Sequence, residues 1–534
     1  MSTKKSIQIF DTTLRDGSQA EGIALSVADK VKIARKLDEL GVHYIEGGWP
    51  GSNPKDNEFF TQMKSVKLKR AKLVAFGSTR RVDIAASSDK SFQNILDTGV
   101  ATVCLFGKTW DLHVRQALRI SLEDNLKIIA DSLAFFKQKK KTVFFDAEHF
   151  FDGYKANKTY AMNCLKAAAK SGADILVLCD TNGGSLPHEV SAIVKIVRSK
   201  IKTPIGIHCH NDSELAVANT LAAVAGGAMQ VQGTINGIGE RCGNANLVSV
   251  IANLDLKMDR ETVGRVQLKK LAETAHYVDQ VLNRVPSKQQ PFVGLSAFAH
   301  KGGVHVNAVL KNRLTYEHID PKWVGNDQRI LLSDLSGLAT IRHKLTKLGF
   351  ASLDLDEGKL LQLIKEREQL GYQYEDAEAS FAILVSHALK SYRPHFLLVD
   401  FKVTDSIHAD ATPKAEARLT LRVGDKESQA EAVGVGPVHA LDEALRKCLV
   451  SFYPVLASVQ LTDYKVRVLS TQAGTRSMVR VHIAFSDGQQ NWNTVGVSEN
   501  IIQASYRALV DGIDYKLLSL DSQAFKSKRP ANNL

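Results

Sequence analysis

The 534-residue sequence predicts a (β/α)8 barrel followed by two smaller regions. Within about the first 250 residues, short apolar strand-like runs alternate with helix-like runs, and eight such units can be counted. Strands that alternate with helices pair in parallel, and eight of them close into a barrel. An open doubly wound sheet is the alternative. That fold usually has a glycine-rich phosphate loop after its first strand, where this chain has DTTLRDG (11–17).

The expected strands lie in chain order, each followed by a turn rich in Gly, Asp, Asn or Thr. They are Ser6–Phe10, His43–Glu46, Lys72–Phe76, Ala101–Phe106, Thr142–Asp146, Ile175–Cys179, Ile205–His208 and Met229–Gly233. A helix is expected over Ser26–Leu40, with Ser26 as its N-cap and Gly41 just past its end. Another is expected over Pro187–Arg198, because proline suits a first helical turn.

Beyond the barrel the pattern changes twice. From about 255 to 390 it is mainly helical, with helices expected at Gln267–Leu282 and Glu357–Glu368. After 396, strand-like runs Phe396–Val403 and Ala417–Val423 precede a helix at Val438–Leu449. The theme then repeats, since VGV (433–435) returns at 495–497 and DYK (463–465) returns at 514–516.

This repeat predicts a duplicated three-strand-plus-helix α/β module. We therefore divide the chain into a barrel (1–285), a helical linker region (286–395), the duplicated α/β domain (396–525) and a tail (526–534).

The composition excludes several classes of protein. Hydrophobic residues make up 44% and charged residues 24%, as in ordinary globular chains. No apolar run approaches the ~18 residues of a membrane span, and the start MSTKKSIQIF lacks a secretory core. Six cysteines without a C-x-x-C pair indicate a reducing cytoplasm. The net charge of +12 comes without a nucleic-acid motif, so we expect a solvated basic surface and no nucleic-acid partner.

Two histidines of the seventh strand give the most specific candidate site. His208 and His210 are two residues apart, so a strand points both side chains to one face. Asp16 follows the first strand and Asn244 follows the eighth, and these strands are neighbours in a closed barrel. Such a mixed nitrogen and oxygen set suits a divalent metal such as Mg, Mn, Co or Zn. The alternative is a pair of histidines satisfied by hydrogen bonds alone.

Three other rim residues could act on a substrate. Arg15 could neutralise an oxyanion or a carboxylate, or form only a salt bridge. Glu148 follows the fifth strand and could act as a base, or pair with a lysine. Thr181 could donate its hydroxyl group to a substrate carboxylate, or cap the helix that follows it.

Three motifs together resemble one known family, the 2-isopropylmalate, homocitrate and citramalate synthases. They are DTTLRDG (11–17), HCHND (208–212) and GIGERCGN (237–244), and the resemblance extends over nearly the whole chain. The segment IEGGWPGSNPKD (45–56) looks like the citramalate branch, because the isopropylmalate branch usually has an Ala-Gly-Phe-Pro sequence there. Where the related synthases have Thr-Ser-Asp-x-His, this chain has TWDLH (109–113). We expect the bulky Trp110 near the keto-acid pocket, which fits a smaller substrate. This departure also weakens the residue-by-residue match on strand four, so we assign no role to Cys104, Trp110 or His113.

The resemblance implies an acyltransferase that performs a Claisen-type condensation. An α-keto acid would bind the metal, and Arg15 would help to polarise its keto group. A base would then remove a proton from the methyl group of the co-substrate acetyl-CoA. Glu148 matches the family's acidic residue, and Thr181 matches a contact to the keto-acid carboxylate. His305 and Tyr316 match residues that reach the site of a neighbouring subunit, which implies a homodimer.

The citramalate branch implies pyruvate as the keto acid and (R)-citramalate as the product. It also implies a first step of isoleucine biosynthesis, with isoleucine bound at the C-terminal repeat as a regulator. An isopropylmalate synthase that uses 2-ketoisovalerate is the alternative, because its substrate differs by only two methyl groups. A biotin-dependent carboxyltransferase is disfavoured, since LCDT (178–181) has no lysine at the end of strand six. A lyase would not need the repeat, and an inactive sensor would not need four intact ligands.

Overall fold

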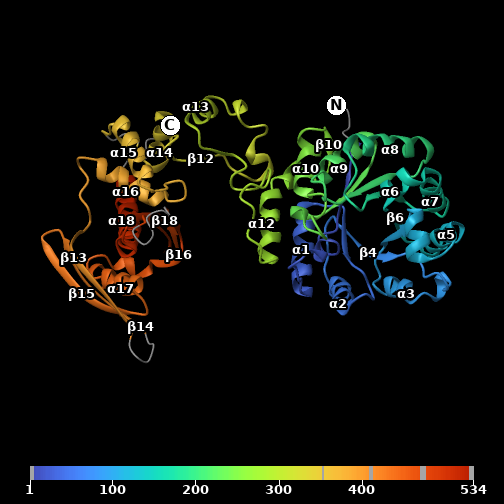
Figure 1. The fold of residues 1–534 in the computed structure, drawn as a ribbon, viewed down its shortest axis with the longest axis horizontal. Coiled ribbons are helices and arrows are strands. Elements are labelled where there is room, and N and C mark those ends of the chain that lie inside the picture. Colours follow the sequence, from blue (N-terminus) through green and yellow to red (C-terminus); the bar gives the residue numbers. More distant parts are fainter. Residues whose placement is uncertain (1–4, 351–353, 408–412, 470–476, 528–534) are drawn as a thin grey trace. The chain divides into compact units, whose positions relative to one another are not determined.

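The computed structural model describes residues 5–350, 354–407, 413–469 and 477–527 (Figure 1). The chain divides into two compact units, Met1–Phe298 with His318–Gln328, and Ala299–Glu317 with Arg329–Leu534. Of the predicted tail, residues 528–534 lie outside the described residues. Among the helices that the structure describes, none has the length and apolar character needed to cross a bilayer.

Eight parallel strands close into a barrel, which confirms the predicted fold class. They are β2 (Gln8–Asp11), β3 (Tyr44–Gly48), β4 (Lys72–Ser78), β5 (Thr102–Lys108), β6 (Thr142–Glu148), β7 (Ile175–Asp180), β8 (Ile205–Cys209) and β9 (Gln230–Gly233). The ring closes because β2 pairs with both β3 and β9. Buried rings such as Phe10, Tyr44 and Phe144 fill its interior. The carboxyl ends of all eight strands open at one rim.

Helices cover the outside of the barrel (Figure 1), and their aliphatic and aromatic side chains form a buried core with the strands. The main ones are α1 (Val27–Leu40), α2 (Pro54–Met63), α3 (Lys90–Asp97), α5 (Leu122–Gln138), α6 (Phe150–Ala156), α7 (Lys158–Lys170), α8 (Pro187–Lys200), α9 (Ala216–Gly226) and α10 (Leu247–Leu256). Local chemistry sets the ends of α1 as predicted. Ser26 caps it through a capping box with Asp29, and Gly41 ends it at a φ of 88°.

Two expected elements of the first unit differ from the structure. The expected strand Ser6–Phe10 is divided, because Ser6 belongs to β1 (Lys5–Ser6), which pairs with β10 (Arg260–Glu261) outside the barrel. The expected helix Gln267–Leu282 is also broken, into α11 (Arg265–Leu268) and α12 (Leu271–Val281). Its apolar spacing continues across the break, so periodicity alone does not reveal the interruption.

The second unit begins with a helical region. Its helices are α13 (Gly303–Lys311), α14 (Leu338–Leu348), α15 (Glu357–Gln369) and α16 (Glu378–Ala388), together with the short parallel pair β11 (Ala299–His300) and β12 (Arg329–Ile330). Apolar side chains of α14, α15 and α16 share a core with Val495 and Val497. This core fixes the helical region to the C-terminal module.

The C-terminal module contains two copies of a three-strand-plus-helix unit, which confirms the predicted duplication. The first copy is β13 (Leu397–Ile407), β14 (Pro413–Val423), β15 (Lys426–Gly434) and α17 (Pro437–Leu449), and the second is β16 (Gln460–Val468), β17 (Val479–Ser486), β18 (Asn491–Ser498) and α18 (Ile501–Ser527). Each sheet is antiparallel, and both helices contribute to one apolar core.

One of the two expected sequence echoes is wrong. DYK (463–465) lies in β16, whereas its supposed copy at 514–516 lies in helix α18. The structural counterpart of DYK is DFK (400–402) in β13, because a shift of strand register precedes both Asp400 and Asp463. The other echo is correct, since Gly434 and Gly496 both lie within the last three residues of the third strand of their copy and pack closely against a helix.

Candidate active site

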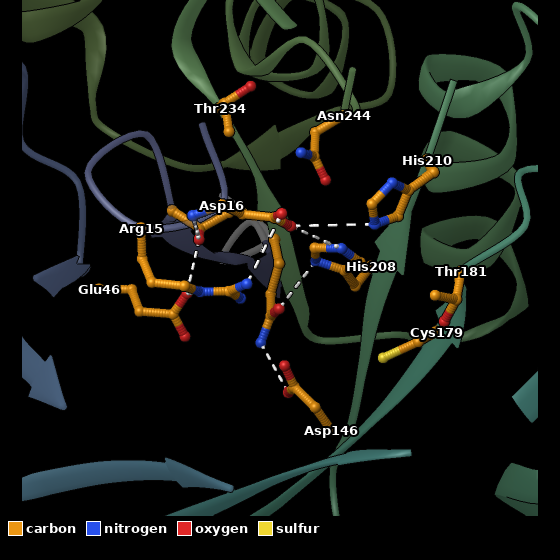
Figure 2. A network of polar contacts seen from close by, with 12 residues as sticks. Arg15, Asp16, Glu46, Asp146, Cys179, Thr181, His208, His210, Thr234 and Asn244 are labelled. Atoms are coloured by element: carbon orange, nitrogen blue, oxygen red, sulfur yellow. Dashed lines mark hydrogen bonds and ion pairs between the residues drawn. The ribbon is translucent and has the colours of Figure 1, made fainter. Parts of the chain in front are cut away.

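Polar side chains from several strand ends meet at one rim of the barrel (Figure 2). Arg15 and Asp16 lie in the loop after β2, His208 lies on β8, and His210 lies just beyond that strand. Asn244 lies in the loop after β9 and forms an isolated β-bridge with His210. Barrel closure thus brings together the four residues that the sequence predicts as metal ligands.

The ligand atoms are close enough to share one cation. The Asp16 Oδ2 atom is 3.3 Å from His208 Nε2 and 3.9 Å from His210 Nε2. The Asn244 side chain extends toward the same point (Figure 2), and its buried Oδ1 has no hydrogen-bond partner among the described residues. A buried oxygen without a partner is unfavourable, and a cation would satisfy it. The donor set therefore fits a divalent metal.

Burial and neighbouring charges set the protonation of these ligands. Burial alone would raise the pKa of Asp16, but Arg15 and His208 outweigh it and hold that pKa well below its usual range. Burial, reinforced by His208, lowers the pKa of His210 to about 3, so this imidazole is neutral at physiological pH. The ionised Asp16 and the neutral His210 are in the state that a metal requires. At His208, burial lowers the pKa, but the raising effect of Asp16 outweighs burial and raises the pKa, so metal binding there would displace a proton.

A glutamine that the sequence interpretation missed orients His208. The Gln232 Oε1 atom lies 3.0 Å from His208 Nδ1, and Gln232 Nε2 donates to Asp146 Oδ1 at 3.0 Å. An amide oxygen accepts only, so Nδ1 of His208 carries a proton, and Nε2, which faces Asp16, is the ring atom that would bind a metal. This is the supporting contact typical of metal-binding histidines.

Arg15 lies beside the candidate metal site and faces the same cavity. Its Nε donates to Glu46 Oε2 at 2.6 Å, and its Nη1 is 3.6 Å from Asp16 Oδ1. The guanidinium also lies 3.7 Å from the centre of the Phe76 ring. These contacts hold a fixed positive charge next to the ligands, where it can meet an anionic substrate.

Glu148 and Thr181 both line this cavity. Glu148 forms an ion pair with Lys108, the residue paired with it across β5 and β6, so the lysine contact considered from the sequence does exist. Thr181 Oγ1 accepts a hydrogen bond from the backbone N–H of His149 at 2.9 Å. The N-cap of α8 is Leu186, so Thr181 does not cap that helix, and its hydroxyl proton remains available to a ligand.

The cavity above the ligands is small, at about 200 Å³. Its lining combines charged and polar residues with the rings of Trp49, Phe76 and Phe106. Trp110 was expected near this pocket, but it is not among the described residues that line it. Its ring stacks instead on His113, with the ring centres 5.2 Å apart. The indole that lines the cavity is that of Trp49. Trp49 faces the cavity because the register of β3 shifts between Glu46 and Gly48, which residue spacing alone does not reveal.

His305 and Tyr316 lie in the second unit, with their ring centres 4.3 Å apart. His305 is on α13, and both residues are exposed. The structure thus pairs the two residues with one another.

Comparison with known proteins agrees with this architecture. The HMGL-like family matches residues 6–278, the homocitrate synthase post-HMGL domain-like family matches 292–374, and the LeuA allosteric (dimerisation) domain matches 375–517. An (R)-citramalate synthase from Geobacter sulfurreducens is 53% identical to this chain, over 96% of this chain and 97% of the relative. The chain belongs to the (R)-citramalate synthase family.

Two further relatives indicate to which branch of the family this chain is more similar. An (R)-citramalate synthase from Aquifex aeolicus is 50% identical over 96% of this chain and 98% of the relative. A 2-isopropylmalate synthase from Methanocaldococcus jannaschii is only 32% identical over 95% of this chain and 94% of the relative. The chain is thus more similar to these two citramalate synthases than to that isopropylmalate synthase, as the segment 45–56 predicts.

Proposed function

We propose that this chain condenses acetyl-CoA with pyruvate and water to give (R)-citramalate and CoA. One observation carries the proposal: Asp16, His208 and His210 converge beside Arg15 in a cavity of about 200 Å³. The chain is 53% identical to an (R)-citramalate synthase, and a site of this size and charge would bind a small α-keto acid. The reaction would supply a first intermediate of isoleucine biosynthesis.

Asp16, His208, His210 and Asn244 would hold the divalent cation, which supplies a Lewis acid for the keto oxygen when bound. Gln232 keeps Nε2 of His208 directed at the ligand position.

The substrate contacts come from two other residues. The Thr181 hydroxyl, whose lone pair accepts from His149, can donate its proton to the pyruvate carboxylate. Arg15, fixed by Glu46 and stacked on Phe76, stabilises negative charge that develops on the keto oxygen.

The carbon–carbon bond forms after a base removes one methyl proton of acetyl-CoA. The resulting enolate attacks C2 of pyruvate, the keto oxygen becomes the hydroxyl group, and water cleaves the thioester to release CoA. Two groups can take the proton. Glu148 does so only if its ion pair with Lys108 opens, whereas His305, beside Tyr316, would act from the partner subunit.

The C-terminal module is proposed to bind the end product. It matches the LeuA allosteric (dimerisation) domain, and isoleucine is the end product that would inhibit a citramalate synthase. Inhibition of the full chain by isoleucine, but not by leucine, tests this assignment.

The test of the reaction is release of free CoA from acetyl-CoA with pyruvate or 2-ketoisovalerate as acceptor. We expect kcat/KM to be higher for pyruvate. A higher value for 2-ketoisovalerate would make the chain a 2-isopropylmalate synthase. Release with neither acid, in protein loaded with Mn or Mg, would reject the condensation itself.

A further inference from the structure

The cavity has a single apolar wall, and its three rings form one unit. Trp49 lies 5.6 Å, centre to centre, from both Phe76 and Phe106, and these two rings stack on one another at 5.3 Å. Apart from Cys179, the other described residues that line the cavity are polar or charged. These rings therefore form the largest apolar surface against which a substituent of a bound acid can pack.

Trp49 reaches this wall because β3 contains a bulge. Glu46 is paired with Val74 of β4, but the next pair is Gly48 with Ala75, so Gly47 is an extra residue. Side chains of a regular strand alternate, and alternation from the inward Glu46 would point residue 49 outward. The extra residue reverses the alternation, and Trp49 shares the inner face with Phe76.

The two glycines of the bulge are required by contact distances. A Cβ atom at Gly47 would lie 2.4 Å from the ring of Phe59. A Cβ atom at Gly48, whose φ is +151°, would lie 2.5 Å from the carboxyl carbon of Asp56. Phe59 and Asp56 of α2 thus leave room only for glycine at both positions of the bulge.

A buried ion pair fixes the backbone at Trp49. Its N–H donates to Asp56 Oδ2 at 2.8 Å, and Asp56 is paired with the buried amine of Lys30. Asp56 in turn lies in the first turn of α2, which Asn53 caps. The indole is therefore carried on a clamped backbone, so it can act as a rigid wall.

We propose that Trp49, directed inward by the β3 bulge, sets the upper size of the 2-oxo acid side chain that this enzyme accepts. The inference rests on the proposed condensation. Because the Arg15 guanidinium lies on the face of Phe76, a 2-oxo acid whose keto oxygen faces Arg15 would have its C3 near the rings. The C3 methyl group of pyruvate would fit against the indole, and the branched C3 of 2-ketoisovalerate would overlap it.

The test compares kcat/KM for pyruvate, 2-oxobutanoate and 2-ketoisovalerate in the wild type and in Trp49→Ala. One methylene in an apolar pocket changes discrimination by about 10–200-fold. We therefore expect the preference for pyruvate over 2-ketoisovalerate to fall at least about tenfold. Trp110→Ala is the matched control, because this tryptophan stacks on His113 away from the cavity lining, and its preference should equal that of the wild type.

A folded Trp49→Ala enzyme with the wild-type preference would overturn the inference. If that variant does not fold, Phe106→Leu removes a ring of the same wall, and its preference is judged by the same two outcomes. The wild-type measurement keeps the two proposals separate. A wild type inactive with all three acids rejects the condensation, whereas a pyruvate-specific wild type with an unchanged Trp49→Ala preference rejects only the role of Trp49.

Discussion

The orientation of one imidazole depends on residues that do not touch the cation position. His208 faces Asp16 through Nε2 because Gln232 accepts from its Nδ1, and Asp146 holds the amide of Gln232. Burial raises the pKa of Asp146, so this acid is less readily ionised than usual. Two buried side chains inside the barrel, Gln232 and Asp146, thus set the orientation of His208.

Removing this support should weaken metal binding without removing a ligand. We expect Gln232→Leu to lower metal affinity about 10–100-fold, because His208 loses the contact that sets its tautomer and ring angle. Competition with a chelator of known affinity measures the change. Gln230→Leu is the control, since Gln230 is a buried glutamine of the same strand that donates to Gln8. Equal affinities for the two variants would contradict the role of Gln232.

Sequence reasoning reaches some of these residues and not others. Asp16, His208 and His210 follow from strand alternation and from the rule that barrel sites lie at strand ends. Gln232 does not follow, because its partner depends on the register between β8 and β9, in which His208 is paired with Gln232. Trp49 was missed because one inserted residue reverses the face of everything after it.

At the scale of elements, the C-terminal module depends on two glycines at equivalent places. A Cβ atom at Gly496 of β18 would lie 2.0 Å from the carbonyl oxygen of Ala504 in α18, and one at Gly434 would lie 2.5 Å from the backbone nitrogen of Ala440. Each glycine thus lets a helix approach its sheet closely. The repeated VGV is therefore visible in the sequence because close packing of the helix on the sheet requires a glycine at the same place in both copies.

We expect Gly496→Ala to destabilise the folded chain by about 2–3 kcal/mol, because the added methyl group overlaps the backbone of α18. Thermal unfolding of the full chain measures the shift in Tm. Gly436→Ala is the control, because its Cβ atom would meet no described atom within 4 Å. Equal stability of the two variants would contradict the close contact between Gly496 and the backbone of α18.

Helices and strands could be located from the sequence wherever local signals agree. The cap at Ser26 and the stop at Gly41 define α1, because both act on adjacent backbone. The DYK repeat was assigned to the wrong partner because three letters carry no information on backbone conformation, and the copy at 514–516 is helical.

At the scale of the whole molecule, the barrel and the module are each specified by repeating units. The eight strands could be counted because each apolar run ends at a turn. The predicted boundaries at 285, 395 and 525, and the interlocking of subunits through His305 and Tyr316, stay predictions. Domain boundaries and subunit interlocking both depend on contacts between residues far apart in the sequence or in different subunits, and a local sequence pattern does not contain this information.

Mixed subunits test the contribution of His305 across the dimer. We expect Arg15→Ala and His305→Ala to be inactive alone and to regain activity when mixed under conditions of subunit exchange. Half of the dimers would then be mixed, with one intact site of two, so about a quarter of wild-type turnover should return. Activity that stays at the level of the separate variants would place His305 and Arg15 in the same site of one chain.

Bound divalent metal per chain, measured side by side for the wild type and His208→Ala, tests the central claim most directly. The account predicts a single tightly bound ion in the wild type. It predicts loss of that ion in His208→Ala, together with loss of pyruvate-dependent CoA release, in a protein with an unchanged circular dichroism spectrum. A His208→Ala chain that keeps both its metal and its turnover would contradict it.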